Sequence, residues 1–121
     1  MDAQLRILVV DPDIAHADEL ERFLVQGGNL VRVATSREQA VLACNQLRPE
    51  LALLGLALPD VDSIDLGREL LEAGVKFMVG MTAFTSSEQA RRALQSGFTS
   101  LLVYPVDRAD VARMVAAIAR V

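Results

Sequence analysis

The sequence has few of the residue types that build disulfide frameworks, metal centres or aromatic binding platforms. It contains one cysteine, one histidine, one tyrosine and no tryptophan among 121 residues. A single cysteine excludes an internal disulfide and suits a reducing cytosol, and a single histidine excludes a metal site built from several imidazoles. Cys44 lies among apolar residues at helical spacing, which is typical of a buried packing thiol. His16 lies early in an expected amphipathic helix, and we predict that it faces solvent.

Long apolar runs and clusters of positive charge are also missing. The longest apolar stretches have the length of a strand, well short of the roughly 20 residues of a membrane helix. The N-terminus has no basic segment followed by an apolar one, as a secretory signal would. The formal net charge is −4, and the basic residues are scattered along the chain. Because nucleic-acid binding needs a concentrated cationic surface, we expect a cytoplasmic domain with neither a membrane nor a direct nucleic-acid partner.

What the sequence does have is a regular alternation of short apolar runs with amphipathic helical stretches. Hydrophobic residues make up 52% of the chain, which is enough to bury one core. The expected strands are 5–10, 30–34, 51–54, 76–81 and 101–103. The expected helices are 14–27, 36–47, a segment from Ile64 to Gly74, a segment from Thr85 to Gly97, and a last helix that opens at Asp107.

Two helix starts carry a specific capping pattern. Ser36 with Gln39, and Thr85 with Glu88, have the spacing of a capping box, in which two side chains satisfy free backbone N–H groups. Strict alternation of helices with uninterrupted apolar strands predicts a parallel sheet covered on both faces. We expect residues 1–121 to form a single domain, which either stands alone or is the N-terminal domain of a longer protein.

A parallel sheet of this kind binds ligands at the carboxyl ends of its strands. That rule selects a set of residues, which are Asp11, Pro12 and Asp13 after the first strand, Gly55 after the third, Thr82 after the fourth, and Tyr104 and Pro105 after the fifth. Neither G-x-G-x-x-G nor G-x-x-x-x-G-K-[ST] occurs in the chain, so dinucleotide and P-loop sites lack their phosphate cradle.

The segments ILVVDPD, PELALLGLALPD, MTA and YPVD, in this order and spacing, resemble the receiver domain of bacterial two-component response regulators. The resemblance covers essentially the whole chain. It implies an α/β, flavodoxin-like (βα)5 fold, a doubly wound three-layer α/β/α domain whose parallel five-stranded sheet has the order 2-1-3-4-5. It also implies a bacterial signalling role, in which such a domain takes a phosphoryl group from a phosphohistidine. That chemistry needs an aspartate nucleophile, acidic ligands for Mg²⁺ and a cation beside the phosphoryl oxygens.

The chain departs from the family pattern at four positions. Gly55 aligns with the phosphoacceptor aspartate and has no side chain that could form an acyl phosphate. Pro12 replaces one member of the acidic pair, Tyr104 replaces the lysine, and Leu101 replaces the aromatic switch residue. Of the usual metal-binding carboxylates Asp11 is retained, so we expect no catalytic residue, no cofactor, and at most weak Mg²⁺ binding.

The remaining polar residues of this vestigial pocket have competing interpretations. We predict that Asp13 is a helix N-cap, with substitution for the lost acidic ligand as the alternative. Thr82 matches the family's switch hydroxyl, and capping or packing at the strand end explains it equally well. We hypothesise that the Tyr104 ring leans over the space above Gly55. The resemblance also implies a cis peptide bond between Tyr104 and Pro105.

We therefore interpret the chain as a pseudo-receiver, a phosphorylation-independent protein-interaction module that is not an enzyme. The alternatives are a small-ligand sensor built on the emptied pocket, and a receiver phosphorylated on another carboxylate such as Asp60 or Asp62. The resemblance places the contacts with a protein partner, an output domain or a second copy on the fourth helix, fifth strand and fifth helix. The residues expected on that face are Ala90, Arg91, Leu94, Gln95, Leu101, Val103, Arg108, Ala112, Arg113 and Ala116.

Overall fold

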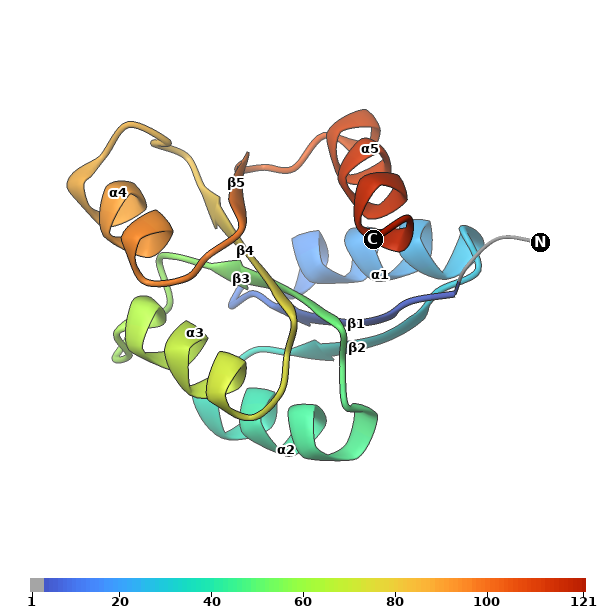
Figure 1. Ribbon diagram of the computed structural model, residues 1–121, viewed down its shortest axis with the longest axis horizontal. Helices are drawn as coiled ribbons and strands as arrows, with labels where there is room; N and C mark the ends of the chain where they lie inside the picture. The colour runs from blue at the N-terminus through green and yellow to red at the C-terminus, as the bar shows by residue number, and fades with distance from the viewer. Residues whose placement is uncertain (1–3) are drawn as a thin grey trace.

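Five apolar segments pair as the strands of one parallel sheet, which lies between two layers of helices in the computed structural model of residues 4–121 (Figure 1). The strands are β1 (Arg6–Val10), β2 (Leu30–Ala34), β3 (Leu51–Gly55), β4 (Phe77–Thr82) and β5 (Ser100–Val103). The helices are α1 (Ile14–Gln26), α2 (Arg37–Leu47), α3 (Ser63–Glu72), α4 (Glu88–Gln95) and α5 (Arg108–Ala119). The sheet order is β2-β1-β3-β4-β5, which confirms the expected fold class and strand order.

The alternation of side chains along each strand divides the core into two halves. Successive strand residues point to opposite faces of a sheet, so Ile7 and Val9 of β1 pack with α1 and α5, while Leu8 and Val10 pack with α2, α3 and α4. These four side chains are all fully buried. Figure 1 shows the same division, with α1 and α5 on one side of the sheet and the other three helices on the opposite side.

Side-chain caps fix where the helices begin. The Asp13 carboxylate accepts the His16 backbone N–H and caps α1, as predicted from the sequence. The predicted start at Thr85 was wrong, because the Ser87 side chain caps α4 by accepting the Ala90 N–H. The Ser87 N–H itself donates to the Phe84 carbonyl in a turn, so the helix begins only after that turn closes.

The strand register brings the sequence-predicted site residues to one edge of the sheet. Val10 pairs with Leu54 across β1 and β3, and Thr82 pairs with Val103 across β4 and β5. Because the strands are parallel, the residues that follow them emerge side by side. Among residues 4–121, no helix is both long and apolar enough to cross a membrane.

One close approach between helix and loop depends on a missing side chain. Gly67 of α3 lies against the ring of Phe98, which leads from α4 into β5. A Cβ atom at position 67 would lie 2.4 Å from the Phe98 Cζ atom, far inside van der Waals contact. The absence of a side chain at Gly67 therefore allows Phe98 to be buried between α3 and the sheet.

We predict that Gly67→Ala destabilises the domain by about 1–2 kcal/mol, because overpacking outweighs the gain of up to about 1 kcal/mol in helix propensity. Urea denaturation measures this difference. The matched control is Gly27→Ala, whose added Cβ atom would have its nearest contacts at an ordinary 3.4 Å. The control should stay within about 0.5 kcal/mol of the unmodified protein. A Gly67→Ala variant as stable as the control would contradict the close packing of Phe98.

Candidate functional site

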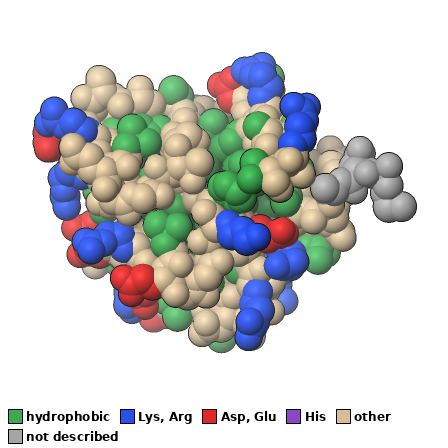
Figure 2. Space-filling model, viewed as in Figure 1, with side chains coloured by type: hydrophobic (Ala, Val, Ile, Leu, Met, Phe, Trp, Pro, Cys, Tyr) green, Lys and Arg blue, Asp and Glu red, His purple; other side chains and the backbone are tan. Residues whose placement is uncertain are grey.

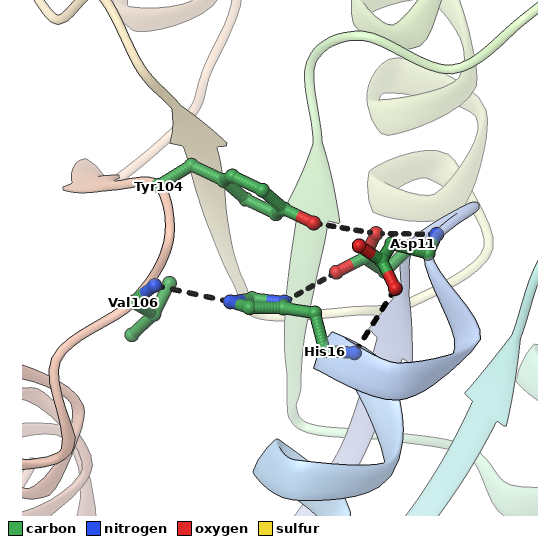
Figure 3. Close-up of polar contacts among 5 residues, drawn as sticks. Asp11, His16, Tyr104 and Val106 are labelled. Carbon is green, nitrogen blue, oxygen red and sulfur yellow. Dashed lines mark hydrogen bonds and ion pairs between the residues drawn. The ribbon is translucent and has the colours of Figure 1, made fainter.

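The carboxyl group of Asp11 lies at the centre of the strand-end region and is fully buried. Its Oδ1 atom accepts the Asp13 backbone N–H at 2.9 Å and the Tyr104 hydroxyl at 3.3 Å. Its Oδ2 atom lies 2.5 Å from the His16 Nδ1 atom (Figure 3). The donors come from the β1–α1 connection, the first turn of α1 and the end of β5, so one side chain joins three segments.

The hydrogen bonds of His16 assign its tautomer. Its Nε2 atom accepts the Val106 backbone N–H at 3.0 Å, so this nitrogen carries no proton. The ring proton then lies on Nδ1 and is donated to Asp11. The imidazole also packs against the Tyr104 ring, with 4.2 Å between the two centroids and 36° between the planes. His16 therefore bridges the Asp11 carboxyl group and the segment that leads into α5 (Figure 3).

The prediction that His16 faces solvent was wrong, because its side chain is only 10% exposed. The packing of α1 directs residue 16 back over the end of β1, where it meets Asp11, and leaves Ile14 exposed. Asp11, once its metal-binding neighbours are absent, needs donors from its own chain. His16 lies five residues after Asp11, in the first turn of α1, and this spacing was the sequence signal for the contact between them.

Five of the sequence-predicted residues line one cavity of about 270 Å³ at the carboxyl ends of the strands. They are Asp11, Pro12, Gly55, Thr82 and Tyr104. Tyr104 thus shares a cavity with Gly55, and its hydroxyl points to Asp11, in agreement with the hypothesis that the ring leans over this space. The Tyr104–Pro105 bond is cis, as the resemblance implied.

The other two residues of the expected pocket do not line this cavity. Asp13 serves as the cap of α1, and Pro105 is exposed. Thr82 has a local structural role, because its Oγ1 atom accepts the Phe84 backbone N–H at 3.1 Å. Asp62 caps α3, and Asp60 lies in a left-handed turn with φ of 60°. Neither Asp60 nor Asp62 lines the cavity.

The side chains at the strand ends do not form a coordination site for Mg²⁺. Pro12 and Gly55 offer no side-chain ligand, and both oxygens of Asp11 already accept hydrogen bonds from the protein. Within residues 4–121, no group of three or more His, Cys, Asp or Glu side chains could hold a metal ion. Mg²⁺ favours octahedral oxygen coordination with one or two carboxylates, which this arrangement does not provide.

On α4 and β5, two residues of the predicted partner-binding face are less exposed than the prediction requires. Ala90 is fully buried, so placing it on a binding surface was wrong. Leu101 is partly buried and packs against the core, close enough that a Cβ atom at Gly80 would lie 3.0 Å from it. Leu94 and Val103 are exposed, at 47% and 56%. On α4 and β5, these two side chains are the exposed large apolar groups of the expected face.

The expected α5 residues also divide between two sides of the helix. The Arg108 guanidinium lies 5.8 Å from the centroid of the Phe23 ring of α1. Ala112 and Ala116 line a cleft of about 600 Å³ that Phe23 shares. Because residues 108, 112 and 116 follow a four-residue repeat, they lie on one stripe of the helix. That stripe faces α1, while Arg113 is exposed and pairs with Asp110.

Comparison with known proteins gives one family for nearly the whole chain. The profile of the response regulator receiver domain matches residues 7–116. A 14.6 kDa protein from Leptolyngbya boryana is 34% identical over 93% of this chain and 88% of its own length. The DNA-binding response regulator MtrA of Mycobacterium tuberculosis is 37% identical over 83% of this chain. This chain spans only 44% of MtrA, less than half of that protein.

Solved structures agree with the sequence comparison. A two-component response regulator from Clostridium difficile has a TM-score of 0.90 and 26% identity, with 97% of both chains covered. A CheY-like receiver domain protein from Methanospirillum hungatei has a TM-score of 0.87 at 24% identity and covers 97% of this chain and 94% of its own.

The environment of Tyr104 predicts a late alkaline titration. Burial of the phenol, followed by the negative charges of Asp11 and Asp13, raises the pKa of Tyr104 to about 12 from an ordinary value of 10.0. The neutral phenol is thus favoured in the folded protein. Its stabilising contribution is complete below pH 10 and is lost as the pH rises towards 12.

Because Tyr104 is the one tyrosine in the chain, the ultraviolet absorbance of tyrosinate reports on this residue alone. Native protein should titrate near pH 12, and protein unfolded in urea near pH 10. Asp11→Asn should lower the native pKa, because it removes the nearest negative charge, and burial should still hold the pKa above 10. An Asp11→Asn titration that matches the unmodified protein would show that Asp11 does not act on Tyr104.

Proposed function

Since the chain belongs to the response regulator receiver domain family of two-component signalling proteins, we propose that it is a pseudo-receiver, which binds a protein partner without taking up a phosphoryl group. The observation that carries this proposal is the hydrogen bonding of the buried Asp11 carboxyl group. It accepts three hydrogen bonds, all donated by the protein itself. The one buried carboxylate of the described strand-end region is therefore held by donors of the protein, so a metal ion would have to displace them.

The position that would carry the phosphoryl group supports the same proposal. Gly55 has no nucleophile, and neither Lys nor Arg is among the described residues that line its cavity. Phosphoryl transfer depends on cations that neutralise the charge of the moving group. The neutral Tyr104 phenol stands where such a cation would act, and its proton is directed to Asp11.

Restoring the aspartate at position 55 alone would not restore a phosphorylation site. A Cβ atom on Gly55 would lie 3.4 Å from the Val10 carbonyl oxygen and 3.8 Å from the Pro12 ring. An aspartate there would place a second carboxylate close to the buried Asp11, with no cation between them. Like charges in a buried site raise the cost of ionisation, so this aspartate would be a poor nucleophile.

The surface proposed for the partner is the α4–β5 patch, which we define as Arg91, Leu94, Gln95 and Val103. Leu94 and Val103 supply exposed apolar area, and Arg91 and Gln95 supply a polar rim. Figure 2 shows hydrophobic side chains in several groups on the face that carries α4 and α5, with charged side chains mostly toward its edges. An apolar centre with a polar rim is the usual anatomy of a protein interface.

We predict that incubation with acetyl phosphate and a divalent cation leaves the mass of the intact protein unchanged. Gly55→Asp should also fail to label efficiently, because Pro12 and Tyr104 remain. The triple variant Pro12→Asp, Gly55→Asp, Tyr104→Lys is the positive comparison, since it restores the acidic ligand, the nucleophile and the cation together. Labelling of the unmodified protein on any aspartate, or normal labelling of Gly55→Asp alone, would overturn the proposal.

A second prediction concerns the α4–β5 patch. The double variant Leu94→Asp, Val103→Asp should lose a partner that the unmodified protein captures from an extract of its own cells. Leu42→Asp is the matched control, because Leu42 of α2 is 57% exposed and lies outside the patch. The control should retain the partner, and adding acetyl phosphate should change neither result. Retention by the double variant would move the binding surface elsewhere.

A further inference from the structure

We propose that the strand-end cavity, which Asp11, Gly55, Thr82 and Tyr104 line, binds a small uncharged ligand with a single ring and one hydrogen-bond acceptor. This inference goes beyond the proposed binding of a protein partner and does not depend on it. It rests on the size of the cavity, the chemistry of its walls and a donor, the Thr82 hydroxyl, that its hydrogen bonds leave free.

The size of the cavity matches a molecule of one ring. Its volume is about 270 Å³. A cavity of about 150 Å³ holds benzene, and pockets for drug-sized ligands begin near 300 Å³. The cavity is therefore large enough for a substituted ring and too small for a nucleotide.

The walls are mainly apolar. Six side chains supply most of the lining, and they are Pro12, Leu56, Ala57, Met81, Ala83 and Phe84. Phe84 is 73% exposed, although large aromatic side chains are normally buried at least in part. A ring in the cavity would contact Phe84, which is one of the lining residues, and would remove part of its apolar surface from water.

The charge of the site excludes ionic ligands. Among the described residues that line the cavity, Asp11 is the one that carries a formal charge. Its oxygens accept from Asp13, His16 and Tyr104, so a cation would have to displace these donors. An anion would meet the carboxylate of Asp11 without any compensating Lys or Arg in the described lining. A neutral ligand avoids both costs.

Two side chains of the lining keep polar capacity for recognition, the Thr82 hydroxyl and the Gln89 amide, and the hydroxyl is the donor that we assign to the ligand. Its oxygen accepts the Phe84 N–H, which leaves its own proton free to be donated. The Leu56 carbonyl, by contrast, already accepts the Gln89 Nε2–H at 2.7 Å. The Tyr104 proton goes to Asp11. A carbonyl or ether oxygen on the ligand is thus the complementary group.

Three probes of similar size separate these features in a titration followed by amide chemical shifts. Acetophenone has the ring and a carbonyl acceptor, benzoate adds a negative charge, and toluene lacks the acceptor. Acetophenone should produce saturable shifts at Gly55, Ala57 and Phe84 with a millimolar dissociation constant. Benzoate should bind at least about tenfold more weakly, and toluene roughly fivefold more weakly, the worth of one hydrogen bond.

Two variants test the location of the ligand. Ala83→Leu, which adds volume at the cavity wall, should abolish the acetophenone shifts. Ala112→Leu adds the same volume in the larger cleft between α1 and α5 and should leave them unchanged. Thr82→Val should weaken the binding of acetophenone and leave the binding of toluene unchanged. The amide spectra of all three variants also report whether the fold is intact.

Three results would each overturn the proposal. The first is the absence of saturable shifts at Gly55, Ala57 and Phe84. The second is equal binding of benzoate and acetophenone, which would remove the argument from charge. The third is a change in amide chemical shifts at Ala112 and Val115 in place of the cavity residues, because this would place the ligand in the α1–α5 cleft. Loss of the protein partner in the capture experiment has no bearing on these outcomes, so the two proposals fail independently.

Discussion

The arrangement of the strand ends depends on the buried carboxyl group of Asp11. A polar group that is 0% exposed must find donors, because leaving its acceptors unpaired costs about 1–3 kcal/mol or more. The chain supplies them from three places, namely the Asp13 N–H, the His16 imidazole and the Tyr104 hydroxyl. His16 extends the network to the Val106 N–H. The requirement of one carboxyl group thereby fixes the start of α1 and the path of the chain from β5 into α5.

The unusual residues of the site are physically consistent with one another. Tyr104 reaches Asp11 across a cavity that Gly55 leaves open. A side chain at position 55 would first meet the Val10 carbonyl and the Pro12 ring, and a long one would compete with the phenol for the same space. The buried carboxyl group of Asp11 is held by hydrogen-bond donors, of which the Tyr104 hydroxyl is one. This consistency supports treating the substitutions as one altered site.

The fold could be predicted from the sequence because it depends on local periodicity, whereas much of the site could not. Uninterrupted apolar strands between amphipathic helices are sufficient for a parallel sheet, and Asp13 precedes its helix in the usual position of a cap. His16 was misjudged because its partner Val106 is distant in sequence, and only tertiary packing brings them together. Ala90 was misplaced for a related reason, and the sequence did not show that Arg108, Ala112 and Ala116 lie on the side of α5 that faces α1. The rotation of a helix about its axis is set by what packs against it, and small residues such as alanine leave that rotation unspecified in the sequence.

A domain that switches needs a ligand whose affinity differs between two conformations, by about 5.5 kcal/mol for an almost complete change of population. In the proposed pseudo-receiver no phosphoryl group provides that difference. Leu101 is already packed against Gly80, and Gln89 at the start of α4 is bonded to the Leu56 carbonyl. These contacts link α4 and β5 to β4 and to the residue that follows β3. Gln89 and Phe84 line the strand-end cavity, and Leu94 projects from the same helix as Gln89. A neutral ligand in the cavity would therefore contact the helix that carries the proposed partner surface.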